Sequence, residues 1–110
     1  MDLPLRLPSE NENSKSVFWM YGVVLKNKKL NAKILAEKLE NRGIETRPLF
    51  LGMHQQPVLK KMKLFNNEKF PVTEELSRFG LYLPSGIKLN KKKINFICNV
   101  LKDIFHESRK

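Results

Sequence analysis

The sequence predicts an α+β fold in which a small antiparallel or mixed sheet carries helices on one side. Residues 17–25 form an uncharged run rich in β-branched and aromatic residues, which is typical of a buried strand. Near the C-terminus, apolar residues recur at helical spacing. Shorter strand and helix patterns lie between these two segments, in the order β-α-β-loop-α-β-α.

Composition limits the class of protein. The chain has 110 residues, of which 41% are hydrophobic, enough for one packed domain. No apolar run approaches the ~20 residues of a membrane span, and we find no signal-peptide pattern at the N-terminus. Cys98 is the only cysteine and His54 and His106 are the only histidines, so we expect neither a disulfide nor a metal site. We expect a cytoplasmic protein without a membrane partner.

Basic charge is abundant but scattered. The chain carries 21 Lys and Arg against 11 Asp and Glu, a net charge of +10. Most of these cations are lysines, whereas base recognition favours arginine and single-strand binding needs interleaved aromatic residues. The pattern therefore favours a solvated basic surface over a specific nucleic-acid site, with a polyanion site as the alternative.

The first half of the chain begins with a polar segment, residues 1–16, which we interpret as a tether. The strand at 17–25 follows, and its pattern predicts a central strand that is covered on both faces. Within it, Trp19 and Tyr21 are expected in the core, with contact to a neighbouring domain as the alternative for both.

A helix is expected after this strand, and its two ends have recognisable signals. Asn31 is a suitable N-cap, and Leu30 and Leu35 have the spacing of a hydrophobic staple. Gly43 stands where a left-handed residue after the helix is needed. Residues 44–50 then resemble a second strand, in which Pro48 indicates an edge position or an exit from the sheet.

The middle of the chain is a long excursion. Residues 51–71 contain only a short helical turn at 58–62, and loops of this length are often functional. A short helix at 72–79 and a strand at 81–83 follow.

The last helix has the clearest pattern. Asn90 is its expected N-cap, and Leu89 and Ile94 form a staple. Its apolar stripe consists of Ile94, Ile97, Cys98, Leu101, Ile104 and Phe105. Cys98 lies on this stripe, so we interpret it as a buried structural thiol.

Polar residues concentrate in the proline-bounded loop at 47–57. Arg47 suits a carboxylate or a phosphate, because its guanidinium donates two parallel hydrogen bonds. His54, Gln55 and Gln56 can bind sugar hydroxyls. The alternative is purely local: Arg47 pairs with Glu45, and His54 caps a turn. Because loop positions away from a core tolerate substitution, we expect changes at Arg47 or His54 to leave stability nearly unaltered.

Several motifs resemble the C-terminal part of the DegT/DnrJ/StrS-type pyridoxal-phosphate (PLP)-dependent sugar aminotransferases, and in particular the perosamine-synthase-like members. These motifs are the segments 17–22 (VFWMYG), 43–48 (GIETRP), 53–58 (MHQQPV), 70–77 (FPVTEELS) and 80–86 (GLYLPSG). They occur in the family's order over nearly the whole chain. The departures are Lys91, Lys92 and Lys93 in a first helical turn that is often acidic in the family, and Lys63 where a turn glycine is frequent.

The resemblance implies the small C-terminal domain of a fold-type-I enzyme, at residues 17–110, that moves an amino group from glutamate to a nucleotide-linked keto sugar. In the family the Schiff-base lysine and the other PLP-binding groups belong to the large domain, which is missing from this sequence. The resemblance therefore assigns no catalytic or cofactor residue here and implies that the chain alone binds no PLP and is inactive. It assigns substrate contacts to Arg47, His54, Gln55 and Gln56, and it implies a large cofactor domain or a second subunit as partner.

The sequence is also compatible with two other hypotheses. In the first, the chain is a basic binding module that kept the fold without an enzymatic role. In the second, it is a fragment with no independent role.

Overall fold

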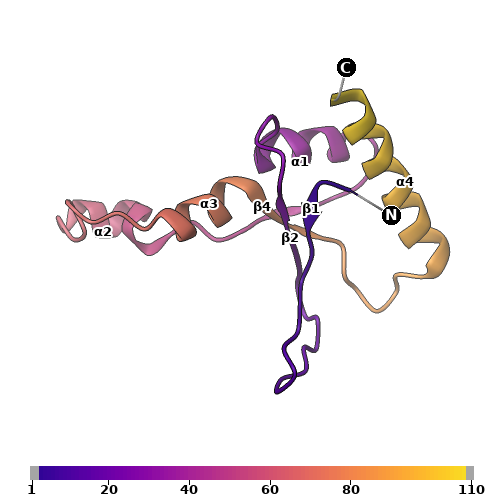
Figure 1. Cartoon of the computed structure of the whole chain (residues 1–110). Helices are drawn as coiled ribbons and strands as arrows, with labels where there is room; N and C mark the ends of the chain where they lie inside the picture. Colours follow the sequence, from indigo (N-terminus) through magenta and orange to yellow (C-terminus); the bar gives the residue numbers. More distant parts are fainter. Residues whose placement is uncertain (1–2, 109–110) are drawn as a thin grey trace.

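The computed structural model describes residues 3–108. Its elements, in chain order, are β1 (Leu5–Arg6), β2 (Tyr21–Leu25), α1 (Ala32–Glu40), β3 (Arg47–Pro48), the 3-10 turn η1 (Met53–Gln55), α2 (Pro57–Lys61), α3 (Pro71–Phe79), β4 (Gly80–Leu83) and α4 (Lys91–Ser108). The four strands form one antiparallel sheet in the order β1-β2-β4-β3 (Figure 1). The α+β class predicted from the sequence is confirmed.

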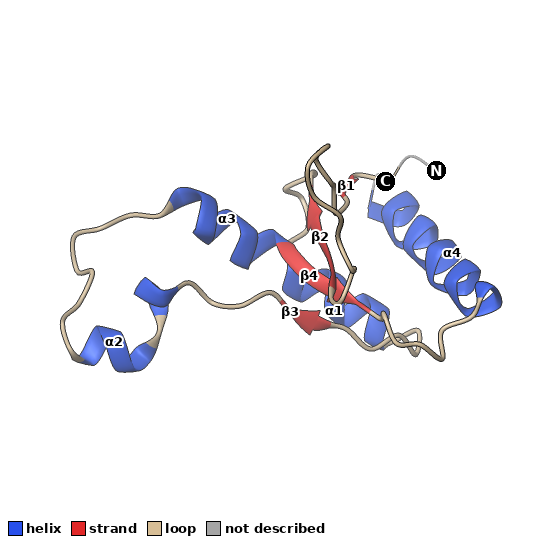
Figure 2. Ribbon diagram, turned by 90° about the horizontal axis from the view of Figure 1, so that it is seen from below, coloured by secondary structure: helices blue, strands red, loops and turns tan. Residues whose placement is uncertain are grey.

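One face of the sheet carries the core. Val23 and Leu81 lie opposite each other in the β2–β4 register, and both are fully buried. Helices α1 and α4 cover this face (Figure 2). They contribute most of the remaining buried side chains: Leu35 and Leu39 from α1, and Val100, Leu101, Ile104 and Phe105 from α4. At roughly 25 cal/mol per Å² of apolar surface, this burial is the main stabilising contribution to the fold.

The helix ends follow the local signals. The Asn31 side chain accepts a hydrogen bond from the Ile34 backbone N–H at 2.9 Å, and the Asn90 side chain accepts one from Lys93 at 2.9 Å. Both predicted N-caps are therefore confirmed. Gly43 has a φ of 79°, the left-handed conformation expected after α1.

The N-terminal tether is only partly a loop. Leu5 and Arg6 form β1, Leu5 pairs with Leu25, and its side chain is buried. The expectation of a polar tether over residues 1–16 missed this strand, because two residues are too few to show a periodicity. Its first two residues lie outside the described part.

The strand expected at 17–25 begins only at Tyr21. Phe18 has a φ of 50°, so its left-handed backbone interrupts the extended run. Trp19 is 76% exposed and Tyr21 is half-buried, so the expectation that both belong to the core is wrong for Trp19 and only partly right for Tyr21. β2 is central, as predicted, but only one of its faces is fully covered.

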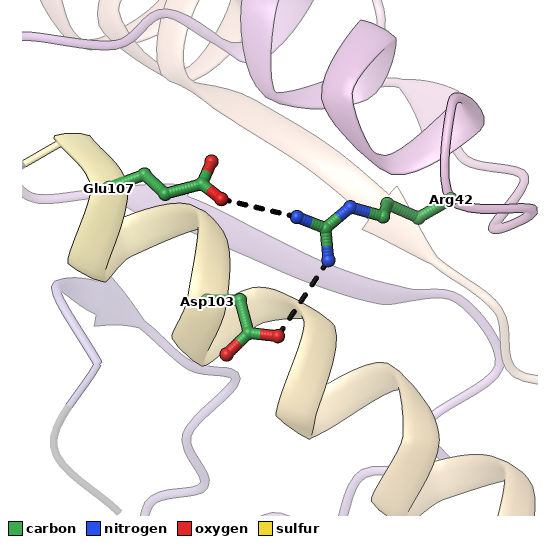
Figure 3. Close-up of polar contacts among 3 residues, drawn as sticks. All are labelled: Arg42, Asp103 and Glu107. Atoms are coloured by element: carbon green, nitrogen blue, oxygen red, sulfur yellow. Dashed lines mark hydrogen bonds and ion pairs between the residues drawn. The ribbon is translucent and has the colours of Figure 1, made fainter.

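An arginine joins the two core helices on the outside. Arg42, just after α1, lies 3.7 Å from the Asp103 carboxylate and 3.3 Å from that of Glu107, both on α4 (Figure 3). All three side chains are substantially exposed, so solvent screens this pair of contacts.

The segment 51–70, which we call the arm, extends away from the sheet and carries η1 and α2 (Figures 1 and 2). The predicted helical turn within it is confirmed as α2. The molecule is accordingly elongated, with principal extents of 48 × 40 × 24 Å. Several apolar side chains of the arm are exposed, among them Met53, Val58 and Met62 at more than 60%.

Candidate functional site

Arg47, one of the predicted site residues, lies on the face of the sheet opposite the core. Arg47 on β3 pairs with Tyr82 on β4, which in turn pairs with Gly22 on β2, so these three positions share that face. Arg47 is exposed and Tyr82 is half-buried. Within residues 3–108 no helix covers Arg47, so its exposed side chain is available to a partner or a ligand.

Gly80 lets the start of the loop at 47–57 lie close to the sheet. A Cβ on Gly80 would overlap the Leu49 side chain, whereas one on Gly22 would make only ordinary contact with the Tyr82 ring. Leu49 therefore packs over Gly80, and the neighbouring Phe50 lies edge-on to Tyr82 with ring centroids 6.0 Å apart. These contacts fix the loop beside Arg47.

Arg47 lines two adjoining hollows. One, of about 550 Å³, lies between Trp19, Glu45 and the chain after β4. The other, of about 750 Å³, lies beside Phe50 and Leu51. No ion pair in residues 3–108 includes Arg47, so the predicted local alternative, a pair with Glu45, does not form. Its guanidinium is positioned to bind an anion that enters either hollow.

His54 lies apart from Arg47, in the arm. Its Nε2 is 3.0 Å from the Glu74 carboxylate on α3, and its ring centroid is 4.8 Å from that of Phe70. Its side chain is only 9% exposed. A Cβ on Gly52 would lie 2.7 Å from the imidazole, so a glycine is needed there for the ring to fit. The structure thus gives His54 a tertiary structural role, which sequence reasoning missed, rather than a local turn cap.

Gln55, the last residue of η1, and Gln56, which follows it, differ in their hydrogen-bond partners. Gln56 Nε2 donates to the Leu51 carbonyl at 3.2 Å, which closes the loop on itself. The Gln55 side-chain oxygen is buried and accepts no hydrogen bond within the described part of the chain. Gln55 is therefore the amide of this loop with unused hydrogen-bonding capacity.

The described residues do not fit a PLP site. A Schiff-base lysine needs a pocket that also holds the cofactor ring and a partner for its nitrogen. The lysines of residues 3–108 are exposed or half-buried, and the hollow that Lys33 borders, beside Pro48 and Arg78, is lined by no carboxylate. Within the same residues, no three His, Cys, Asp or Glu side chains gather as metal ligands, and no helix is long and apolar enough to cross a membrane.

Comparison with known proteins identifies the family of the chain. A family model described as the DegT/DnrJ/EryC1/StrS aminotransferase family matches residues 1–102. The chain belongs to this family. The resemblance noted in the sequence is therefore confirmed, and the match begins before the segment in which we recognised it.

Relatives of this aminotransferase-family chain include a GDP-perosamine synthase of Vibrio cholerae, 29% identical over 94% of the chain and 28% of the relative. A GDP-perosamine synthase of Escherichia coli O157:H7 is 28% identical over 88% of the chain and 26% of the relative. The putative pyridoxal phosphate-dependent aminotransferase EpsN of Bacillus subtilis (strain 168) is 29% identical over 80% of the chain and 23% of the relative. The chain thus spans about a quarter of the length of the curated relatives it matches.

Solved structures show the same fold within aminotransferases. Helicobacter pylori PseC, an aminotransferase involved in the biosynthesis of pseudoaminic acid, matches with a TM-score of 0.70 and 21% identity over 80% of this chain and 24% of that one. The aminotransferase TlmJ from Streptoalloteichus hindustanus matches with a TM-score of 0.69 and 19% identity over 94% of this chain and 26% of that one. The small α+β fold is therefore one that forms part of larger aminotransferase chains.

The sequence analysis proposed Arg47 as a site residue but did not identify the residues around it. Trp19 and Tyr82 line the same hollow as Arg47, although neither was a candidate site residue. Tyr82 could have been found, because strand alternation places it on the face opposite Leu81 and Leu83. Trp19 depended on the backbone at Phe18, which no sequence pattern indicated.

Proposed function

We propose that this chain is the small C-terminal domain of a PLP-dependent aminotransferase that acts on nucleotide-linked keto sugars, working beside a larger cofactor domain. The observation that carries the proposal is the uncovered sheet face around Arg47. Trp19 is 76% exposed and Phe50 is 74% exposed at its margins. Large exposed aromatic side chains around a cation mark a surface that another body covers.

The other body would be a large domain or a second subunit that holds PLP, the group that carries the amino group between donor and acceptor. No step at the cofactor is assigned to this chain, because the lysines of residues 3–108 do not form such a site. The role of the chain is to close the substrate side and to supply polar contacts there.

Arg47 would bind the carboxylate of the amino donor glutamate or a phosphate of the nucleotide sugar. Gln55 and Gln56 would contact sugar hydroxyls only after the loop opens, because the Gln55 side-chain oxygen is buried and the Gln56 amide already donates to the Leu51 carbonyl. His54 would act mainly by holding the loop, since its imidazole is already bonded to Glu74. A direct contact of His54 with the sugar would require it to give up that bond.

The test is reconstitution. The chain is co-expressed with the isolated cofactor domain of a family relative, and amino transfer from glutamate to a GDP-linked keto sugar is followed by mass spectrometry. Arg47→Ala should lower kcat/KM about ten- to a hundredfold, the effect of losing one charge-assisted bond. Arg6→Ala, which removes an exposed arginine from the distant edge strand β1, is the matched control. Equal kinetics of the two variants would show that Arg47 does not contact the substrate.

A further inference from the structure

A second surface lies on the core side of the sheet, beside the N-terminal half of α4. The apolar side chains in the C-terminal half of α4 are buried, but those in its N-terminal half are not. Ile94 is 44% exposed, and Ile97 and Cys98 are half-buried, so the expectation of a buried Cys98 thiol is only partly right. Between this half and the ends of β2 and β4 is a hollow of about 400 Å³, which we call the α4 groove. Its walls include Ile94, Ile97 and Cys98 on one side and Tyr21, Leu83 and Leu89 on the other.

The chemistry of the groove suits an apolar occupant. Its lining residues with polar side-chain groups are Tyr21, Ser85 and Cys98, and the Ser85 hydroxyl already donates to the Trp19 carbonyl at 3.3 Å. A nucleotide or a sugar would need several convergent donors and acceptors. The lining residues from α4 are at positions 94, 97, 98 and 101. This spacing places them on one face of the helix, against which another helix can pack.

The margins of the groove are cationic. Lys91 precedes Ile94 by three residues and Lys93 precedes Ile97 by four, so helical spacing places these two lysines at the groove and Lys92 on the far side of α4. The first turn of α4 contains no acidic residue, and no ion pair in residues 3–108 includes any of these three lysines. Lysines at a helix N-terminus oppose the helix macrodipole, so they weaken the fold that carries them.

We propose that the α4 groove binds an acidic amphipathic helix of a partner protein. The apolar side of that helix would fill the groove, and its carboxylates would meet Lys91 and Lys93 and offset their unfavourable place at the start of α4. A second copy of this chain is a poor occupant, because each copy carries a net charge of +10. The inference goes beyond the proposed function, since the groove does not include Arg47 or any residue of the arm.

Cys98 allows a direct measurement, because it is the only cysteine and lies in the groove. The full chain is treated with a chromogenic thiol reagent in the presence of a designed helix of about 15 residues, with Leu at i, i+3, i+4 and i+7 and Glu at its other positions. This peptide should slow modification of Cys98 at micromolar concentration. With Lys in place of Glu, the peptide should need an at least about tenfold higher concentration to protect Cys98 equally. Added salt should reduce this difference between the acidic and the basic peptide.

Matched variants on α4 separate the groove from the rest of the helix. Ile94→Asp should weaken peptide binding about tenfold, whereas Phe96→Asp, an equally exposed position outside the groove lining, should not. The double variant Lys91→Glu/Lys93→Glu should weaken binding about three- to tenfold, and Lys92→Glu should have little effect. Circular dichroism of each variant confirms that the fold is retained.

Three results would overturn the proposal. The first is equal protection by the acidic and basic peptides, or equal effects of the groove variants and their controls. The second is protection of Cys98 by raising the concentration of the chain alone, which would make a second copy the occupant. The third is protection by single-stranded DNA that matches the acidic peptide at the same salt concentration, which would make the lysines a polyanion site.

Discussion

Replacing His54 by alanine is the sharpest test of how the arm is held to the domain. The wild-type imidazole makes a hydrogen bond to Glu74 at 3.0 Å and packs on Phe70 at 4.8 Å between ring centroids. A net hydrogen bond stabilises by about 0.5–1.5 kcal/mol, and an aromatic contact by a similar amount. Because the Glu74 side chain is 42% exposed, solvent screens its charge, and we expect a total loss of about 1–2 kcal/mol.

The loss should be concentrated in the arm, since the partners of His54, Phe70 and Glu74, lie outside the buried core cluster. Urea unfolding followed by circular dichroism measures the global free energy, and native-state hydrogen exchange measures the opening of residues 51–70. His106→Ala is the matched control, because His106 is the other histidine and its side chain is exposed on α4. Glu74→Gln should have a smaller effect than His54→Ala, since an amide oxygen can still accept the bond.

The result that would refute this reasoning is a His54→Ala variant with the unfolding midpoint and arm exchange rates of the wild type. That result would support the expectation from sequence that position 54 tolerates substitution. It would also mean that the wild-type imidazole is not needed to hold the arm and is available to bind a substrate. For Arg47 that expectation stands unchanged, because its exposed side chain makes no ion pair within the described residues.

Three further predictions concern stability, measured by urea unfolding. Trp19→Ala should change the free energy of unfolding by less than about 0.5 kcal/mol, because the ring is exposed. Leu81→Ala, at a fully buried position, should lower the free energy of unfolding by about 2–5 kcal/mol. Equal losses in the two variants would contradict the assigned burial. Arg42→Ala should cost about 0.3–1 kcal/mol at low salt and almost nothing at high salt, and a salt-independent loss would indicate a packing role instead. Gly43→Ala should cost about 1 kcal/mol because of its left-handed backbone, and a stabilising effect would show that the conformation relaxes freely.

The features that were predictable from sequence are those fixed by near neighbours in the chain. Both helix N-caps depend on a side chain and a backbone N–H three residues later, so Asn31 and Asn90 could be identified directly. The left-handed Gly43 depends only on the end of α1. The edge position of Pro48 follows from its missing N–H, and β3 indeed pairs only with β4.

The features that were not predictable depend on residues far apart in the sequence. β1 exists because Leu5 pairs with Leu25, and a two-residue strand has no periodicity to detect. The contact between His54 and Glu74 joins the arm to α3 across 20 positions, and nothing near either residue indicates it. For the same reason the resemblance to the family could nominate His54 as a substrate contact without revealing that its imidazole is already paired.

Hydrophobic pattern alone also cannot tell whether an apolar residue is buried by its own chain or by another. Trp19 and Ile94 both satisfy the pattern of core residues, yet both are substantially exposed. β4 explains how this happens. Leu81 and Leu83 face the core side, where the core cluster buries the first and the groove lies beside the second, and Tyr82 faces the open side next to Arg47. One short strand thus supports two uncovered surfaces of different chemistry. A cation among aromatic residues is what the proposed substrate side requires, and an apolar groove beside lysines is what the proposed acidic helix requires. Together the two proposals would account for apolar residues that the fold itself does not bury.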